Sequence, residues 1–256
     1  MDNTFFYILI YFIIYSFLGW ILESTVRTIC ERKIINTGFL IGPFCPIYGF
    51  GAIIMILFLN RFENNIILLF FISFIVLSIW EYIVGVLLEK LFKTKYWDYS
   101  KNRFNFKGRV CLANSLAWGV LGVLFIKYIH PFIQHIIGYV DYIYVAIIAS
   151  IIALILLIDA IISIVKVKNI QTTLQKIEEI NEQIKEKLLE LKEKNVTNDN
   201  IQMLVDKLKA KRDKTLRNLY KRAYRLKKAF PAIDTKEFTE ILNKKIELKK
   251  RKKEGD

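Results

Sequence analysis

The chain has 256 residues, 54% of them apolar, and its formal net charge is +14. The apolar residues are concentrated in long runs in the first two thirds, and most charged residues lie in the last third. This distribution excludes a wholly water-soluble protein and indicates a membrane-embedded region followed by a soluble one.

Five apolar runs are long enough to cross a bilayer, at residues 5–22, 39–59, 66–88, 110–129 and 142–165. The first run has no basic start and no small-residue cleavage site, so we expect a retained span rather than a signal peptide. The sequence therefore predicts an all-α membrane protein. A five-span transmembrane helix bundle would occupy residues 1–165, and a basic cytoplasmic helical tail would occupy residues 166–256.

The second run is broken by four glycines and two prolines within residues 38–51. Pro43 and Pro46 each lack a backbone N–H and disturb the helix one turn before them. Hydrocarbon cannot satisfy the freed carbonyl groups, so such a segment persists only where protein or a water-filled cavity covers it. Two interpretations stay open: a substrate site, as in the broken helices of transporters, or a glycine-rich surface on which helices pack closely.

Carboxylates at membrane depth are the second unusual feature. Polar stripes run along the third and first runs: Ser78, Glu81, Gly85 and Glu89, and Tyr15, Gly19 and Glu23. Glu81 and Asp159 are the most costly, because a buried carboxylate must be paired, protonated or hydrated. Arg27 and Arg109 are the nearest counter-charges in the sequence. Glu81 would either contact a cation, a proton or a polar substrate, or join helices through an ion pair or hydrogen bond.

The first four runs read as two copies of a two-helix unit. In each copy a Gly-x-x-x-Glu motif ends a run and is followed by a basic loop, a glycine and an aromatic–glycine pair. The corresponding elements are Gly19–Glu23 with Gly85–Glu89, Gly38 with Gly108, and Tyr48-Gly49 with Trp118-Gly119. Both copies enter the membrane in the same direction, so we expect a parallel repeat with its axis along the membrane normal.

Basic residues alternate between the loops. The loop after the first run carries Arg27, Arg32 and Lys33, and the loop after the third carries seven basic residues, whereas the other two loops hold only Arg61 and Lys127. The positive-inside rule therefore predicts an outside N-terminus and a cytoplasmic C-terminus.

The loop between the third and fourth runs, residues 96–109, is rich in the aromatic residues typical of the headgroup level. Asp98 and Asn105 within it are placed to cap broken helix ends.

The three cysteines, Cys30, Cys45 and Cys111, fall at cytoplasmic span ends or in cytoplasmic loops, where disulfides are not expected. Their spacing matches no zinc pattern, and His130 and His135 would lie on the opposite side of the membrane. We therefore expect packing cysteines, no metal and no cofactor.

The tail begins with apolar residues spaced three and four apart: Val167, Ile170, Leu174, Ile177, Asn181, Ile184, Leu188 and Leu191. Asn181 takes an a position of this heptad pattern. A second helix is predicted after residues 196–200, and a short third one after Pro231. A parallel intermolecular coiled coil would place Lys187 against Lys192 of its partner. We therefore favour an antiparallel hairpin of the first two helices within one chain.

The charge excess is located in the tail. Residues 166–256 hold 26 basic and 15 acidic side chains. Such a region beside a bilayer attracts anionic lipid, although a solvated helical surface with excess lysine is the alternative. Nucleic acid is less favoured, because no recognition motif accompanies the charge.

Several motifs occur in one order along the chain: Tyr15–Trp20 with Glu23, Asn36–Gly49, Glu81 with Glu89, Trp97–Ser100, Gly108–Leu112 and Trp118-Gly119. Together they resemble the ABC-transporter type IV family, permease-like integral membrane proteins of Firmicutes, over residues 1 to about 165. The resemblance implies a bacterial plasma-membrane permease-like protein and names no substrate. No G-x-x-x-x-G-K-[ST] motif occurs in the sequence, so ATP hydrolysis would need a separate ATPase subunit.

The sequence therefore favours a permease-like transport protein, not an enzyme, with a substrate site at the cytoplasmic end of the bundle. The alternative is a non-transporting membrane scaffold or sensor whose basic coiled-coil tail recruits partners or anionic lipid. A homo-oligomer is compatible with either. The candidate substrate or ion contacts are Glu23, Asn36, Gly42, Pro43, Cys45, Pro46, Tyr48, Glu81, Glu89, Asp98, Arg109 and Asp159.

Overall fold

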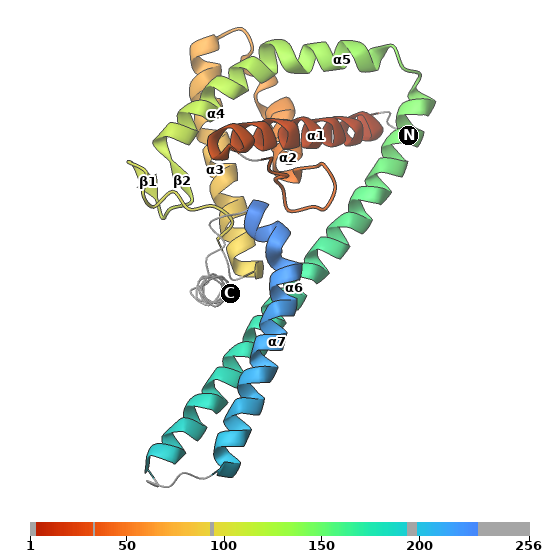
Figure 1. Ribbon diagram of the computed structural model, residues 1–256. Helices are drawn as coiled ribbons and strands as arrows, with labels where there is room; N and C mark the ends of the chain where they lie inside the picture. Colours follow the sequence, from red (N-terminus) through yellow and green to blue (C-terminus); the bar gives the residue numbers. More distant parts are fainter. Residues whose placement is uncertain (1–3, 33, 93–94, 194–198, 230–256) are drawn as a thin grey trace. The chain divides into compact units, whose positions relative to one another are not determined.

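The computed structural model describes residues 4–32, 34–92, 95–193 and 199–229, which are mostly helical (Figure 1). The third tail helix predicted after Pro231 lies outside these residues. The elements are α1 (Thr4–Glu31), α2 (Pro46–Phe58), η1 (Asn60–Phe62), α3 (Ile66–Phe92), β1 (Asn105–Phe106), β2 (Val110–Cys111), α4 (Leu112–Leu124), η2 (Phe125–Ile129), α5 (His130–Gly138), α6 (Tyr142–Glu193) and α7 (Asp199–Ala229). The chain divides into two compact units between Ser163 and Ile164, within α6.

Four helical stretches are long and apolar enough to cross a bilayer: Thr4–Glu31, Ile66–Phe92, Leu112–Gly138 and Tyr142–Glu190. The second predicted run contributes only the 13-residue helix α2, preceded by irregular backbone. Pro46 lies in the first turn of α2, where its missing N–H costs little. The third stretch, Leu112–Gly138, extends beyond the fourth predicted run and contains the π-helical turn η2 just before Pro131. A wider turn of this kind accommodates the hydrogen bond that proline removes.

Glycines let α1 and α2 pack closely in antiparallel directions. A Cβ atom at Gly19 would overlap the Tyr48 side chain, and one at Gly49 would overlap Ser16 and Phe12. Small residues at a membrane helix interface allow such an approach. The glycine-packing interpretation of the second run therefore holds for Gly49.

The same contact type joins α3 to α4. A Cβ atom at Gly119 would overlap the Phe70 ring, and one at Gly122 would overlap Ser73. A shared apolar core then connects the two helix pairs. Its buried residues are Tyr11, Tyr15, Ala52, Met55, Leu59, Leu69, Leu77, Phe125 and Ile126.

Irregular backbone between α1 and α2 runs back alongside α1 and is hydrogen-bonded to it. The bonds join Ile35 N to Thr28 Oγ1 at 3.1 Å, Thr37 N to Ser24 Oγ at 3.3 Å, and Cys45 N to Ser16 O at 2.9 Å. Hydroxyls and a carbonyl of α1 thus satisfy backbone donors that lipid could not. Protein covers this part of the broken segment, as its glycine and proline content predicts.

Asp159 of α6 fastens the middle of the same segment. Its carboxylate accepts the backbone N–H of Ile41 at 2.9 Å and of Gly42 at 2.7 Å, and the Ser163 hydroxyl at 3.2 Å. Charge-assisted bonds of this kind offset the cost of placing a carboxylate beside apolar helices. One costly carboxylate is therefore occupied by the backbone of the broken segment.

We expect Asp159→Asn to destabilise the protein, because one backbone donor would then face an amide N–H₂ instead of an acceptor. Loss of a partner for a buried polar group costs about 1–3 kcal/mol. Thermal unfolding of the purified protein in detergent should show a lower midpoint. Asp141→Asn, at an exposed position before α6, should leave the midpoint unchanged. Equal midpoints for both variants would contradict the fastening role.

The loop between α3 and α4 contains a two-stranded β-hairpin. Asn105 pairs with Cys111 and Phe106 with Val110 in antiparallel register. Lys107 and Gly108 form the turn with φ values of 53° and 69°. Two successive positive φ angles suit a type I′ turn, in which glycine is favoured.

The C-terminal unit is a helical hairpin of the second part of α6 and α7, drawn side by side in Figure 1. Ile180, Ile184 and Val205 are buried between the two helices, with Ile201 and Leu208 packed against them. The predicted a position Asn181 is exposed instead. In a straight helix with 3.6 residues per turn, positions that repeat every 3.5 residues drift away from the interface. Ile180 is therefore buried between the helices in place of Asn181.

Candidate functional site

Glu81 of α3 is the only fully buried carboxylate among the described residues, with 4% of its surface exposed. Its Oε1 atom accepts the Tyr99 hydroxyl at 3.2 Å, and its Oε2 atom accepts the Trp118 indole N–H at 3.0 Å. Tyr99 comes from the loop before β1, and Trp118 comes from α4. Both carboxylate oxygens are therefore held by neutral donors.

Glu23 of α1 stands in a similar arrangement. Its carboxylate accepts hydrogen bonds from the Tyr48 hydroxyl and from the Cys45 thiol, the latter at 3.9 Å. Tyr48 then contacts Trp118, with the two ring centroids 5.8 Å apart. The Tyr48–Trp118 pair thus links the Glu23 group of α1 and α2 to the Glu81 group of α3 and α4. We call these six residues the seam cluster: Glu23, Cys45, Tyr48, Glu81, Tyr99 and Trp118.

Neither carboxylate of the seam cluster forms an ion pair within the described part of the chain. Arg109 pairs with Glu89, and Arg27 lies 3.6 Å from Glu31 while acting on Glu23 electrostatically. A buried carboxylate without a close cation favours a proton, a bound cation or a polar ligand group. The described residues also contain no group of three metal-ligating side chains.

Tyr99 remains a hydrogen-bond donor because of its surroundings. Burial, followed by the neighbouring Glu81 carboxylate, raises the pKa of the Tyr99 hydroxyl well above its usual value. The hydroxyl is therefore protonated at physiological pH, and it can donate to Glu81 but can also accept from a different partner.

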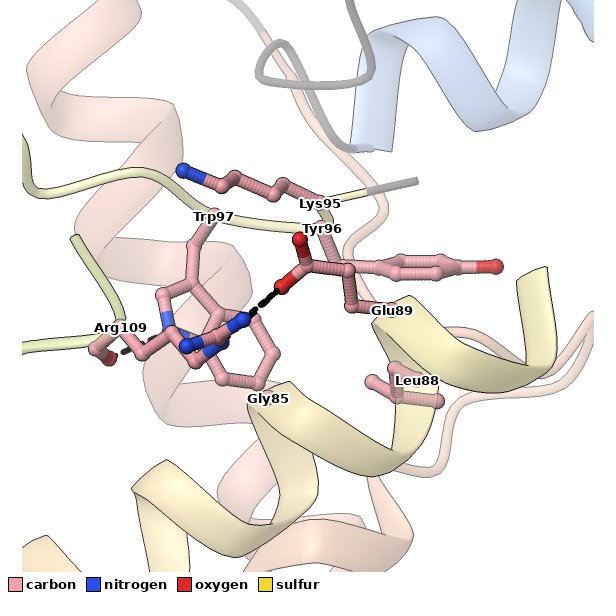
Figure 2. Close-up of a pocket in the computed structure, with 7 residues that line it drawn as sticks. All are labelled: Gly85, Leu88, Glu89, Lys95, Tyr96, Trp97 and Arg109. Atoms are coloured by element: carbon pink, nitrogen blue, oxygen red, sulfur yellow. Dashed lines mark hydrogen bonds and ion pairs between the residues drawn. The ribbon is translucent and has the colours of Figure 1, made fainter. Parts of the chain in front are cut away.

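A small pocket lies at the end of α3 nearest the β-hairpin (Figure 2). Its lining residues are Gly85, Leu88, Glu89, Lys95, Tyr96, Trp97 and Arg109. The Arg109 guanidinium points at Glu89, with Nε 2.9 Å from the carboxylate, while the Lys95 amine points away from it. Trp97 donates to the Arg109 carbonyl at 2.8 Å. Arg109 and Glu89 pair with each other, and Lys95 lies 3.6 Å from Asp98, so internal partners occupy the charged groups of this pocket.

The family model described as "Putative ABC-transporter type IV" matches residues 10–164. The chain belongs to this family. The match ends within α6 and leaves the C-terminal hairpin outside it. No curated protein and no solved structure matches the chain. Family membership gives this ABC-transporter type IV protein a transport-related role, in agreement with its apolar helices.

Four of the twelve predicted contacts of this ABC-transporter type IV protein are brought together by the structure. Glu23, Cys45, Tyr48 and Glu81 belong to the seam cluster. Glu89 and Arg109 lie at the pocket. Gly42 and Asp159 form a bonded pair, and Gly42 lies in the irregular segment before α2, which we call the fastened segment (residues 38–45). The four predicted contacts left outside these groups are Asn36, Pro43, Pro46 and Asp98.

Those four have identifiable local surroundings. Asn36 accepts the Trp20 indole N–H at 2.7 Å, Pro43 is exposed, and Pro46 begins α2. Asp98 accepts the backbone N–H of Ser100 at 3.1 Å and its hydroxyl at 2.5 Å. These bonds lower the pKa of the Asp98 carboxyl, the hydroxyl most strongly. Asp98 closes a turn within the loop, whereas the sequence predicted that it caps a helix end.

Trp118 and Tyr99 are the contacts missing from the predicted set. Tyr99 lies in the loop whose aromatic residues the sequence assigned to the headgroup level, and Trp118 belongs to the predicted aromatic–glycine pair, so neither pattern marked a donor to Glu81. Tyr15 and His130 form a further buried pair, with Tyr15 Oη 2.9 Å from His130 Nδ1. The sequence separation of 115 residues leaves no local pattern from which this pair could be predicted.

Proposed function

We propose that this protein is a permease-like subunit of a plasma-membrane transport system and that the seam cluster contacts the transported species. Glu81 carries the proposal: it is buried, both its oxygens face neutral donors, and no described cation pairs with it. A carboxylate in such surroundings is retained at a cost that a proton, a cation or a polar substrate group would offset.

The arrangement of the seam cluster also fits a duplicated unit. Each helix pair has a loop with a positive-φ glycine, Gly38 at 100° and Gly108 at 69°. Tyr48 and Trp118, which are equivalent in the predicted repeat, each donate to a carboxylate on the first helix of their pair. The two carboxylates are not equivalent, because Glu23 corresponds to Glu89 in the repeat and Glu81 corresponds to Tyr15. The seam cluster would then lie where the two halves meet, which is where transporters built from repeats hold their substrates.

Five crossings with an outside N-terminus are part of the proposal. The second crossing would be composite, made of the fastened segment and α2, because α2 alone covers only about 20 Å at 1.5 Å per residue. Its irregular portion is bonded to α1 through Cys45 N and to α6 through Ile41 N and Gly42 N, so lipid need not satisfy these groups.

Reporter fusions test this topology. We expect fusions after Arg61 and Lys127 to report the outside, and fusions after Lys33 and Arg103 to report the cytoplasm, because basic residues stay inside. An alkaline phosphatase and a fluorescent protein reporter at each site give opposite readouts. A cytoplasmic Arg61 fusion would contradict a composite crossing and would make the broken segment and α2 re-entrant.

A separate ATPase is the partner that the proposal requires. Purification of the chain from its native membranes after mild crosslinking should yield a P-loop ATPase. Reconstitution with that ATPase should make ATP hydrolysis depend on this chain. Absence of any such ATPase would favour the second candidate, a membrane scaffold or sensor, for which the basic C-terminal hairpin provides the interaction surface.

A further inference from the structure

The C-terminal hairpin is strongly polarised in charge along its length. Val205 packs against Ile180 and Ile184, and antiparallel helices with equal rise therefore set residues 210–227 alongside residues 164–178. These two segments form the base of the hairpin and contain 11 basic and two acidic residues. The other described segments, residues 179–193 and 199–209, form the tip and contain five basic and seven acidic residues.

On α7 the basic side chains form a stripe opposite the packed face. Lys207, Lys211, Lys214 and Arg217 are all exposed and fall within about 120° on a helix advancing ~100° per residue. The packed face of α7 is centred about 150° away from this stripe. Its members are Val205, Leu208 and Leu219.

Among the described side chains, none of the ion pairs of the hairpin joins the basic stripe of α7 to an acidic residue of α6. The pairs within the hairpin join neighbours on one helix: Lys187 with Glu190, Lys209 with Asp206, and Arg212 with Asp213. The apolar residues of the packed face are covered, since Val205 and Leu219 are each 1% exposed. Exposed apolar side chains lie at the tip (Leu188, Leu189, Met203 and Leu204) and at the start of the base (Ile164 and Val165). The stripe on α7 therefore offers a partner positive charge.

The basic base is the end of the hairpin that directly follows the apolar stretch of α6 along the chain. Lys166 and Lys168 follow the apolar stretch of α6 directly, and α6 is continuous through both. We propose that the base of the hairpin binds the headgroups of anionic phospholipids in the adjacent leaflet. Each basic residue near such a surface adds ~1 kcal/mol of attraction within a Debye length of ~8–10 Å. An acidic tip would be repelled from the same surface, so the polarity orients the hairpin.

The test uses the full chain in nanodiscs of phosphatidylcholine, alone or mixed with phosphatidylglycerol. A water-soluble amine-acetylating reagent and mass spectrometry report how fast Lys211 is modified. We expect modification about tenfold slower in the anionic discs, since several contacts of ~1 kcal/mol act together. The protection should disappear in molar salt, where the Debye length falls to ~3 Å.

Matched charge reversals locate the interaction. Lys214→Glu with Arg217→Glu at the base should abolish the protection of Lys211, whereas Lys185→Glu with Lys187→Glu at the tip, an equal change in net charge, should preserve it. Equal rates in both lipids, or protection that resists salt, would overturn the proposal. Protection of Lys211 by added RNA but not by anionic lipid would replace the lipid with nucleic acid. If the base variant misfolds, the salt comparison on the unmodified chain still tests the lipid interaction. A Glu81→Gln chain should keep the protection of Lys211, which separates the lipid interaction from the proposed transport site.

Discussion

Glu81→Gln should abolish the transport-linked activity of the protein while leaving its fold intact. Trp118 can only donate, so the amide oxygen should take its place on the Trp118 side. The amide N–H₂ would then face Tyr99, whose hydroxyl can turn from donor to acceptor. The variant keeps the hydrogen bonds of residue 81 and loses only its negative charge. It therefore distinguishes a function that needs the Glu81 charge from a function that needs only its hydrogen bonds.

The measurement is ATP hydrolysis by the reconstituted complex, together with the thermal unfolding midpoint of the purified chain. We expect hydrolysis to fall at least about tenfold if Glu81 supplies ~1.4 kcal/mol or more to the working state. The midpoint should stay close to that of the unmodified chain. Glu63→Gln, at an exposed position after η1, serves as the control and should change neither quantity.

Tyr99→Phe provides the converse variant. It keeps the Glu81 charge but removes one of the side-chain donors to this carboxylate, the others being Trp118 and Asn114. The variant should therefore lower the unfolding midpoint, corresponding to about 1–3 kcal/mol. Normal hydrolysis in Glu81→Gln would assign Glu81 to helix packing alone. The seam cluster would then cease to be the candidate site.

The sequence predicted the direction of several key side chains but not their partners. Helical periodicity placed Ser78, Glu81, Gly85 and Glu89 on one face of α3, and that face meets α4 and the loop before it. Helical periodicity shows which side chains share a face of a helix, but it does not show which residues pack against that face. The donors to Glu81 come from segments 18 and 37 residues away, and the acceptor that fastens Gly42 lies 117 residues away.

The broken second run shows a different limit. Pro43 and Pro46 predicted that regular helix would fail there, and α2 begins only at Pro46. Hydropathy alone assigned a full span to residues 39–59, because the apolar side chains of the irregular backbone count equally with those of a helix. Within that run the backbone N–H groups of Ile41 and Gly42 bond to the Asp159 carboxylate, and that of Cys45 bonds to the Ser16 carbonyl. No local pattern in the sequence identifies these partners.

Gly49→Ala should strongly destabilise the packing of α2 against α1. The new Cβ atom would lie 2.7 Å from the Phe12 carbonyl oxygen and 2.8 Å from the Phe12 ring, and it would overlap the Ser16 hydroxyl. A backbone carbonyl of α1 cannot move aside without shifting the helix. Overpacking of this kind costs about 1–3 kcal/mol and works against the separation of α1 and α2.

Gly51→Ala, two residues further along α2, is the matched control. Its Cβ atom would meet the Trp80 side chain at 3.7 Å and the Leu77 side chain at 3.8 Å, which are ordinary van der Waals contacts. Alanine in a helix is favoured over glycine by ~1 kcal/mol, so this variant should be neutral or slightly stabilising. Size-exclusion chromatography after heating in detergent compares the two. Equal midpoints would mean that α1 and α2 do not approach through Gly49, and the position of Tyr48 beside Glu23 would then lose its structural support.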